Sequence, residues 1–442
     1  MKKIFVIGAG RSSTSLIEYL LNNSEKENWK ITVGDISLDL AKQKTANHKN
    51  ATAIAFDINN EKQRTEQIQQ ADLVISMLPA FLHMNVAQDC IRYKKHMATA
   101  SYVSKEMAAL QEQAKAEGVI LLNEIGLDPG IDHASAMKLI DQIHEAGGEL
   151  TSFKSYCGGL VAPQYNTNPW GYKFSWNPRN VVLAGQGTAQ FIDQGAYKYI
   201  PYNRLFIQVE TIEVEGHGKF EGYANRDSLS YRKIYHIDAI PTMLRGTLRM
   251  PGFCKAWNVF VKLGLTDDTY KIEASEKLTY SELLQAFLPK GNKTIKEKLF
   301  AFMGEEMDQE TWNKIEWLGI TGDRKIKLSD ATPAQLLQDL LEEKWKLEQE
   351  DKDMIVMQHL ISYKNAKSEL KHISSSLVVV GDDTLHTAMA KTVGIPLAIA
   401  SKLILQNKIK ARGVVIPTIK EIYEPVLKEL ESFGVKFEEK EN

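Results

Sequence analysis

Strand-like and helix-like segments alternate along about the first 130 residues, and this alternation restricts the fold more than any other feature of the sequence. Short runs rich in β-branched and apolar residues predict strands at residues 3–7, 30–33, 52–56, 73–76, 96–99 and 119–122. Helical patterns lie between them, as at residues 13–22 and 107–117. Such alternation builds a parallel sheet with helices on both faces, so we expect a doubly wound α/β domain.

A glycine-rich turn joins the first predicted strand to the first predicted helix. Gly8 is expected to make the tight turn, and Gly10 to let the backbone approach a pyrophosphate at the N-terminus of the helix. Ser13 stands where the usual fingerprint has its third glycine. A Gly-x-Gly turn alone is also compatible with a purely structural role, so the assignment needs support from other strand ends.

That support comes from the ends of the next three predicted strands. Asp35 closes the second strand, where a carboxylate accepts hydrogen bonds from the ribose of a dinucleotide. Asp57 closes the third strand, and Ser76 closes the fourth. Together these positions predict a Rossmann-type dinucleotide-binding domain. Because Asp35 would face a 2′-phosphate with like charge, NAD is favoured as the cofactor. NADP stays open, since Lys42 or Lys44 could turn toward a phosphate.

The remainder of the chain has a different pattern. Aromatic and β-branched runs between residues 150 and 266, such as 205–214 and 231–237, favour an open antiparallel or mixed sheet. Residues 267–350 are predicted to be helical, with one helix beginning at Thr332-Pro333. Residues 354–359 and 376–380 predict a hairpin, and residues 388–407 and 417–430 predict helices. The tail, residues 438–442, is expected to be disordered.

Composition excludes several classes of protein. A chain of 442 residues is expected to form two or three domains. Its formal net charge of −2 and dispersed basic residues argue against a nucleic-acid partner, and the longest apolar run is interrupted by Lys402, which argues against a membrane span. The scattered histidines predict no metal site. Three cysteines without a close pair favour a reducing compartment, so a cytoplasmic location is expected.

Two further regions carry residues suited to substrate chemistry. Residues 123–130 follow a predicted strand and therefore lie at the carboxyl edge of the sheet, where open α/β sheets bind ligands. Asp128 in this loop either caps the following helix or belongs to the site, and the two roles are compatible. Arg226, Arg245 and Arg249 lie in loops beside small polar residues, where guanidinium groups can bind carboxylates in a bidentate manner.

The sequence resembles the saccharopine reductases of lysine metabolism, which are the L-glutamate-forming saccharopine dehydrogenases. The resemblance extends in order over nearly the whole chain and is carried by residues 99–104, 123–132, 155–160, 168–176, 225–228, 245–249 and 388–394. It implies reversible, dinucleotide-linked oxidation of saccharopine to glutamate and 2-aminoadipate 6-semialdehyde. Two alternatives stay open: a related reductive condensation such as that of carboxynorspermidine dehydrogenase, and a non-catalytic dinucleotide-sensing homologue.

The resemblance also implies an architecture. A Rossmann domain is expected from residues 1–132 with 384–442, and an all-helical domain from residues 267–350. Residues 133–266 with 351–383 are expected to form a mixed α/β domain that binds substrate and makes a homodimer. An open sheet edge in that domain, which needs covering, also favours the dimer.

The residues that match the family's motifs supply the candidate site. Saccharopine is expected to contact Ser101, Tyr102, Asp128, Arg226, Arg245, Gly246 and Thr247. The cofactor is expected to contact Gly8, Gly10, Arg11, Ser12, Ser13, Asp35, Asp57, Ile58, Ser76, Leu78, Ser101, Leu127, Asp128, Pro129 and Ser175. Asp128 is the candidate catalytic residue, which would orient the amine and stabilise the developing iminium. No residue is assigned as the general base.

Overall fold

A computed structural model describes all 442 residues of the chain. The chain divides into two units. Unit 1 comprises Met1–Glu149, Lys364–Leu370 and Leu377–Glu438, and unit 2 comprises Leu150–Tyr363, Lys371–Ser376 and Glu439–Asn442. Unit 1 thus extends beyond the domain expected to end at residue 132, because helix α7 (Ile131–Glu145) packs against α17 (Lys420–Leu430). The segment 267–350 lies inside unit 2.

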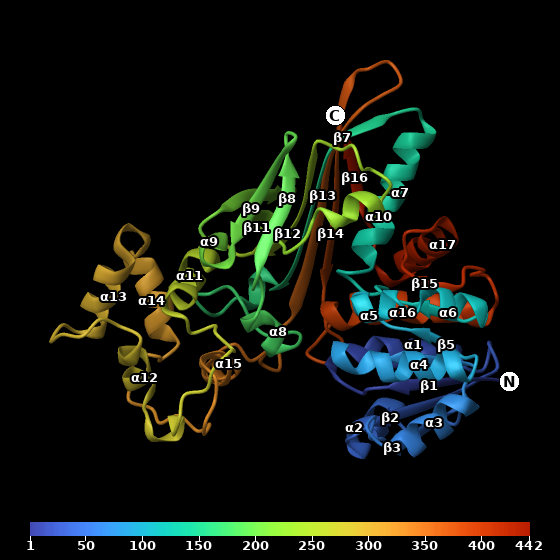
Figure 1. Ribbon diagram of the computed structural model, residues 1–442, viewed down its shortest axis with the longest axis horizontal. Helices are drawn as coiled ribbons and strands as arrows, with labels where there is room; N and C mark the ends of the chain where they lie inside the picture. The colour runs from blue at the N-terminus through green and yellow to red at the C-terminus, as the bar shows by residue number, and fades with distance from the viewer. The chain divides into compact units, whose positions relative to one another are not determined.

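The first sheet has seven strands, and every pair in it is parallel. Its order is β15 (Gly413–Val415), β6 (Ile120–Leu122), β5 (His96–Ala98), β4 (Leu73–Ser76), β1 (Lys2–Ile7), β2 (Trp29–Asp35) and β3 (Ala51–Ala55) (Figure 1). The predicted strands and the doubly wound α/β class are confirmed. The strand order reverses between β1 and β4, which is the switch point where such sheets bind ligands.

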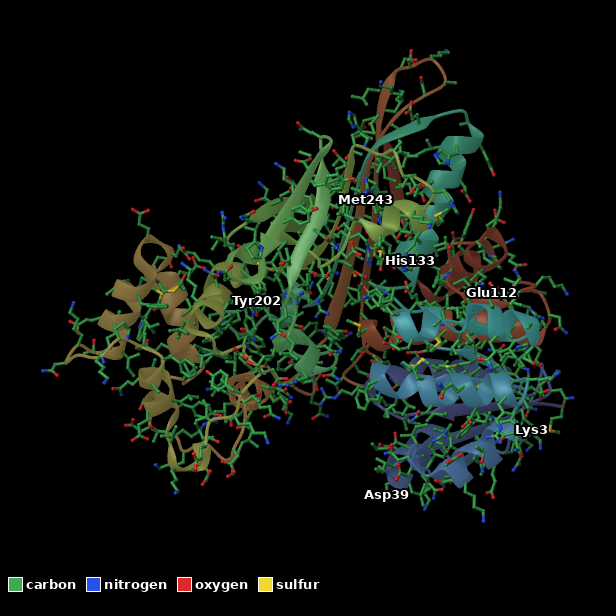
Figure 2. All side chains as sticks on the ribbon, in the orientation of Figure 1. Lys3, Asp39, Glu112, His133, Tyr202 and Met243 are labelled. Carbon is green, nitrogen blue, oxygen red and sulfur yellow. The ribbon has the colours of Figure 1, made fainter.

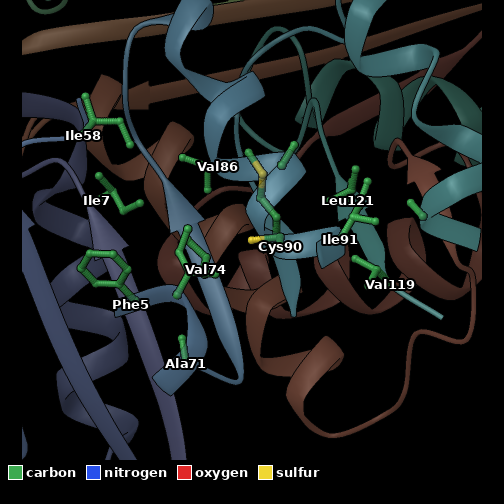
Figure 3. Close-up of a cluster of buried hydrophobic side chains, with 14 of the residues drawn as sticks. Phe5, Ile7, Ile58, Ala71, Val74, Val86, Cys90, Ile91, Val119 and Leu121 are labelled. Carbon is green, nitrogen blue, oxygen red and sulfur yellow. The ribbon is translucent and has the colours of Figure 1, made fainter. Parts of the chain in front are cut away.

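Helices cover this sheet and complete its core. They are α1 (Thr14–Asn23), α2 (Leu38–Thr45), α3 (Glu61–Gln70), α4 (His83–Arg92), α5 (Lys105–Ala108), α6 (Gln111–Ala116), α7, α16 (Ala388–Leu405) and α17. The single helix predicted at 107–117 is two helices, interrupted at Ala109 and Leu110. A core cluster joins strand residues such as Phe5, Val74 and Leu121 to Val86 and Cys90 of α4 (Figure 3).

Helix α16 is the one helix long and apolar enough to cross a membrane by length and composition, and 78% of that stretch is buried. Its burial arises from contact with α1. A Cβ atom added at Gly394 would lie 2.7 Å from the backbone nitrogen of Leu16, so only glycine allows the two helices to approach so closely. The apolar composition is therefore accounted for by core packing.

The second sheet is mixed. Its main path runs β10 (Val209–Val214), β11 (Gly218–Ala224), β12 (Thr242–Arg249), β7 (Glu149–Val161), β13 (Asp353–Lys364), β14 (Leu370–Val380) and β16 (Glu438–Glu441). Off this path, β8 (Thr188–Asp193) pairs with β12, and β9 (Ala196–Pro201) pairs with β8. Strands β10, β11 and β12 are antiparallel, whereas β12 and β7 are parallel. The predicted mixed sheet and the β13–β14 pairing are confirmed.

Three local predictions in this region are wrong. Residues 438–441 are not a disordered tail, because they add strand β16 to the sheet beside β14. Residues 230–234 form helix α10 (Ser230–Ile234), whose Tyr231 is buried, rather than a strand. The run from 205 begins with the end of α9 (Tyr202–Leu205), and its strand starts only at Val209. In each case tertiary contacts override local propensity.

Residues 267–350 contain the predicted helices, which are α12 (Tyr280–Ala286), α13 (Ile295–Met303), α14 (Gln309–Trp317) and α15 (Pro333–Lys344). Two further helices of unit 2, α8 (Pro178–Val182) and α11 (Phe253–Leu263), lie in the region where only a sheet was predicted. Helices α12, α13 and α15 each start at a threonine whose side chain makes a capping box, so Thr332 begins α15 as expected. Buried rings of Trp170, Trp257 and Trp345 pack together, with centroids 5.3 to 6.4 Å apart.

Candidate active site

The turn after β1 has the geometry that a dinucleotide requires. Gly8 has a φ of +104°, and a Cβ atom there would lie 3.1 Å from the carbonyl oxygen of Met77, so no other residue fits without strain. A Cβ atom at Gly10, by contrast, would meet nothing within 4 Å. The face of the turn at Gly10 is thus open, next to the short helical turn Arg11–Ser13 that leads into α1. This fits a pyrophosphate at a helix N-terminus.

Ser13 replaces the third glycine without widening the turn. The side chain is buried, and its hydroxyl donates a hydrogen bond to the carbonyl oxygen of Gly10 at 2.8 Å. Arg11, in contrast, is exposed. This hydrogen bond therefore stabilises the turn on its buried side.

Asp35 is tied to this turn. Its Oδ2 accepts a hydrogen bond from the backbone N–H of Ala9 at 2.7 Å, and its Oδ1 accepts one from Ser37 at 2.8 Å. The carboxylate is thereby fixed at the end of β2, with lone pairs left for further donors. Lys44 donates to the hydroxyl of Thr14, and burial lowers the pKa of its amine.

Three other residues predicted to contact the cofactor lie near strand ends. Asp57 is exposed and follows the end of β3 by two residues, and its Oδ1 accepts a hydrogen bond from the backbone of Asn59 at 2.9 Å. The side chain of Ile58 is buried in the core cluster, and Leu78 packs against that cluster. Ile58 and Leu78 thus have their side chains directed into protein packing.

A buried histidine joins Ser76 to Ser101, and our sequence reasoning missed it. The Nδ1 atom of His83 lies 2.8 Å from the Ser76 hydroxyl, and its Nε2 atom lies 2.7 Å from the Ser101 hydroxyl. Burial lowers the pKa of His83 to about 4, so the ring is neutral near pH 7. The available signal was its position, one turn after Pro79 at the carboxyl end of β4.

The loop after β6 places Asp128 beside Tyr102. The Tyr102 hydroxyl donates a hydrogen bond to Oδ1 of Asp128 at 3.0 Å. The capping role considered for Asp128 is not observed: Gly130 is the N-cap of α7, without a side-chain capping bond. Leu127 and Pro129 on either side are buried, so the Asp128 carboxylate is the half-buried group that this loop presents.

A buried carboxylate holds the base of the same loop. Oε1 of Glu124 accepts a hydrogen bond from the backbone of Val103 at 2.9 Å, and Oε2 lies 2.8 Å from Nε2 of His133 on α7. His133, which Figure 2 labels on α7, is fully buried. This pair, which the sequence did not reveal, connects the segment of Ser101 and Tyr102 with the segment of Asp128 and so fixes their spacing.

Unit 2 holds the predicted arginines in unlike surroundings. Arg245 is only 4% exposed, and its guanidinium lies 4.0 Å from the centre of the Tyr231 ring. Arg226 is exposed, just beyond the end of β11. The backbone N–H of Asn225 donates to the carbonyl oxygen of Arg245 at 2.7 Å, so the two arginines lie on adjacent backbone segments. One guanidinium is thus buried and the other is exposed, although their backbones are neighbours.

Gly246 and Thr247 continue the same strand. A Cβ atom at Gly246 would lie 2.6 Å from the ring of Tyr156, so this backbone is held close to β7. Thr247 is half-buried and pairs with Cys157 across the two strands. The strand thus offers little room for movement around the site.

Arg249 does not share the environment of Arg245. Its guanidinium is buried among the rings of Tyr172, Tyr223 and Phe253, at 5.2, 5.8 and 5.4 Å. The loop positions predicted for Arg245 and Arg249 are wrong, because both residues lie on β12, where their guanidinium groups pack on aromatic rings.

Ser175 lies in a segment that is held by a buried ion pair. The Lys173 amine donates a hydrogen bond to the carboxylate of Asp351 at 2.6 Å, and both side chains are less than 8% exposed. The flanking rings of Tyr172 and Phe174 pack on Trp345, with centroids 5.1 and 5.4 Å apart. The position of the buried Ser175 is thus set by charge and by aromatic packing. No group of three or more His, Cys, Asp or Glu side chains that could hold a metal ion is present.

The parallel sheet, the open glycine turn and the fixed Asp35 define a Rossmann-type dinucleotide-binding domain. Comparison with family models is more specific. The model described as the saccharopine dehydrogenase NADP binding domain matches residues 4–122, and that of the saccharopine dehydrogenase C-terminal domain matches residues 126–435. The chain belongs to the saccharopine dehydrogenase family, and the resemblance seen in the sequence is confirmed.

Individual relatives agree with the family models. Saccharopine dehydrogenase [NADP(+), L-glutamate-forming] of Pyricularia oryzae is 34% identical over 99% of both chains. Mitochondrial alpha-aminoadipic semialdehyde synthase of Mus musculus is 35% identical over 99% of this chain and 47% of its own length.

Solved structures support the same fold. The apo saccharopine dehydrogenase (L-Glu forming) of Saccharomyces cerevisiae has a TM-score of 0.90 at 34% identity, with complete coverage of both chains. A homospermidine synthase of Legionella pneumophila in complex with NAD has a TM-score of 0.58 at 9% identity, covering 100% of this chain and 91% of its own, which shows a shared fold alone.

Proposed function

We propose that this protein is an oxidoreductase of lysine metabolism that interconverts saccharopine with glutamate and 2-aminoadipate 6-semialdehyde. The observation that carries the proposal is the cluster of Ser101, Tyr102 and Asp128 at the carboxyl edge of a dinucleotide-binding sheet. The close similarity in fold to a yeast saccharopine dehydrogenase supports the substrate. Of the alternatives considered from the sequence, a different condensation and a non-catalytic sensor, neither has a supporting feature here.

The residues supply binding and orientation. A bound nicotinamide would supply the acceptor for the hydride that leaves the carbon on the aminoadipate side of the secondary amine. The amine also loses a proton, and water adds to the resulting imine, which then breaks into glutamate and 2-aminoadipate 6-semialdehyde. Asp128 carries a carboxylate that can orient the amine and stabilise positive charge as the carbon–nitrogen double bond forms. Arg226 and Arg245 supply cations for the carboxylates of saccharopine, which fix its register.

We also propose that NAD is preferred to NADP, although NADP(+) appears in the names of fungal relatives. The Asp35 carboxylate is held in place by two backbone N–H groups, so it cannot easily swing away from a 2′-phosphate. Lys44 is already engaged with Thr14, and it is only partly exposed. The free acceptor positions of Asp35 suit the two ribose hydroxyls of NAD.

The test is an absorbance assay of nicotinamide reduction with saccharopine and each oxidised cofactor. We expect turnover with saccharopine and higher kcat/KM with NAD. Glutamate with the aldehyde should run the reverse reaction, whereas diamines in place of glutamate should not. Tight cofactor binding without turnover of saccharopine would instead support the sensor, and turnover with diamines would support the other condensation.

A homodimer formed through unit 2 is the assembly we propose. Strand β9 pairs with β8 alone, so its other edge is open, and Tyr197 and Tyr199 on it are 54% and 61% exposed. Sedimentation should give a dimer at micromolar concentration. The double variant Tyr197→Lys/Tyr199→Lys should be a monomer, while Tyr270→Lys, which changes an exposed tyrosine in the helical segment, should leave the dimer intact.

A further inference from the structure

We propose that His83 is a positioning residue that determines the direction in which the Ser101 hydroxyl points, and that it couples this direction to the hydroxyl of Ser76. The inference rests on the proposed function, in which Ser101 contacts saccharopine. It adds a residue that acts through Ser101 and does not itself contact the substrate.

The geometry places His83 between two strand ends. Ser76 is the last residue of β4 and is fully buried, whereas Ser101 follows β5 and is half-buried. His83 begins α4, is 4% exposed, and reaches both hydroxyls with its two ring nitrogens. The Thr99 hydroxyl lies further from Nε2, at 3.5 Å. The ring therefore bridges the two serines directly, inside one unit of the fold.

The single proton of the neutral imidazole ring determines how this bridge behaves. A neutral imidazole has one N–H donor and one nitrogen acceptor. If Nε2 donates to Ser101, then Nδ1 must accept the proton of the Ser76 hydroxyl; if Nδ1 donates to Ser76, then Nε2 must accept the proton of Ser101. The two serine hydroxyls consequently change direction together, and burial keeps the ring in the neutral state that imposes this coupling.

The nature of the ligand selects between the two states. A carboxylate or carbonyl oxygen needs a donor, so it requires the state in which Ser101 accepts from His83 and directs its own proton outward. A ligand N–H selects the opposite state. Because saccharopine presents carboxylates, we infer that its binding favours Nε2–H of His83, with the Ser76 hydroxyl donating to Nδ1.

Two amide substitutions test separately the hydrogen bond of His83 to Ser76 and its hydrogen bond to Ser101. The side-chain amide of asparagine occupies roughly the place of Nδ1, near Ser76, while that of glutamine extends to the place of Nε2, near Ser101. We expect His83→Asn to raise KM for saccharopine about tenfold and His83→Gln to stay within about threefold of the unmodified enzyme. A purely structural role would make both variants fail together.

A double-mutant cycle tests whether His83 acts through Ser101. In a Ser101→Ala background, His83→Asn should have no further effect on KM, because the positioned group is already absent. Ser76→Ala, which keeps the histidine, should raise KM by a smaller factor and should also lose its effect in that background. This second variant preserves the test if His83→Asn does not fold. Effects of His83 and Ser101 that multiply independently would overturn the inference.

His96 provides a matched control. It is the first residue of β5 and thus lies at the opposite end of that strand from Ser101, and burial also lowers its pKa to about 4. Its Nδ1 accepts a hydrogen bond from the backbone of Ile120 at 3.3 Å. His96→Gln and His96→Asn should leave KM unchanged. If the unmodified enzyme does not turn over saccharopine, the proposed function fails; if it does and His83→Asn is normal, this inference alone fails.

Discussion

The two units hold their candidate site residues by different physical means. In unit 1 the side chains are fixed mainly by hydrogen bonds between neutral groups or to backbone, as in the bridge from Ser76 through His83 to Ser101. In unit 2 they are fixed by buried charge and aromatic faces, as for Arg245 over Tyr231. Neutral networks are sensitive to which donor is present, whereas buried charges are sensitive to the loss of a partner. The two units should therefore respond differently to mutation.

The largest expected effect is on the stability of unit 2. Lys173→Met removes the partner of a buried carboxylate, Asp351, and should lower the free energy of unfolding by about 3–5 kcal/mol. Urea titration followed by tryptophan fluorescence measures this loss, because Trp170 and Trp345 pack in one aromatic cluster with Tyr172, the sequence neighbour of Lys173. Hydrogen exchange should show weaker protection in unit 2 and unchanged protection in unit 1.

Two control variants test whether the unpaired buried charge causes this loss of stability. The double variant Lys173→Met/Asp351→Leu leaves no unpaired charge and should recover much of the loss. Lys2→Ala removes an exposed ion pair with Asp72 and should change stability by less than about 1 kcal/mol. A loss for Lys173→Met no larger than that for Lys2→Ala would show that the buried pair is not what holds the segment of Ser175.

Acid should weaken unit 1 through the buried His83. The pKa of His83 is about 4 in the fold, against 6.5 for an unperturbed histidine, so the unfolded chain binds more protons between these values. Stability is then fully present above about pH 6.5 and falls as the pH drops toward 4, by at most about 3 kcal/mol for His83. Urea titrations at about pH 7 and pH 5 measure the slope, which His83→Gln should reduce. An unchanged slope in that variant contradicts the assignment.

Next in size is the effect of the arginines on substrate binding. Arg226→Ala and Arg245→Ala should each weaken saccharopine binding by about 1.5–3 kcal/mol, or roughly ten- to a hundredfold, and leave dinucleotide affinity nearly unchanged. Calorimetric titration with saccharopine and with the cofactor measures both. Arg204→Ala, at the end of α9, is a control that should alter neither. Normal saccharopine affinity in either variant would show that the arginine is misassigned.

The two units also differ in how much of their structure could be predicted from the sequence. The parallel sheet was predictable because buried parallel strands leave continuous apolar runs, and because Gly8 and Asp35 stand at fixed distances from those runs. In unit 2 the strand predicted at 231–237 is a helix, because Tyr231 packs against a guanidinium from β12 and local propensity does not encode that contact.

Partners of buried polar residues were not predictable in either unit. His83 meets Ser101 across 18 positions, and Lys173 meets Asp351 across 178 positions, so no local pattern links the members of each pair. From the sequence alone, a buried charged residue or histidine cannot be distinguished from one at the surface. The burial and the partner, which decide the function of such a group, come only from the tertiary fold.

The smallest effect concerns cofactor choice, and it tests whether unit 1 responds to charge at all. Asp35→Asn keeps an oxygen that can accept from a backbone N–H but removes the negative charge that faces a 2′-phosphate. We expect the ratio of kcat/KM for NAD to that for NADP to fall about tenfold, mainly through a lower KM for NADP, which corresponds to about 1.4 kcal/mol. Asp72→Asn is the matched control and should leave the ratio unchanged, since Asp72 precedes the amino end of β4 and accepts hydrogen bonds from Lys2 and Lys3. An unmodified enzyme more efficient with NADP than with NAD would contradict the preference itself, and an unchanged ratio in Asp35→Asn would show that the charge at the end of β2 does not set it.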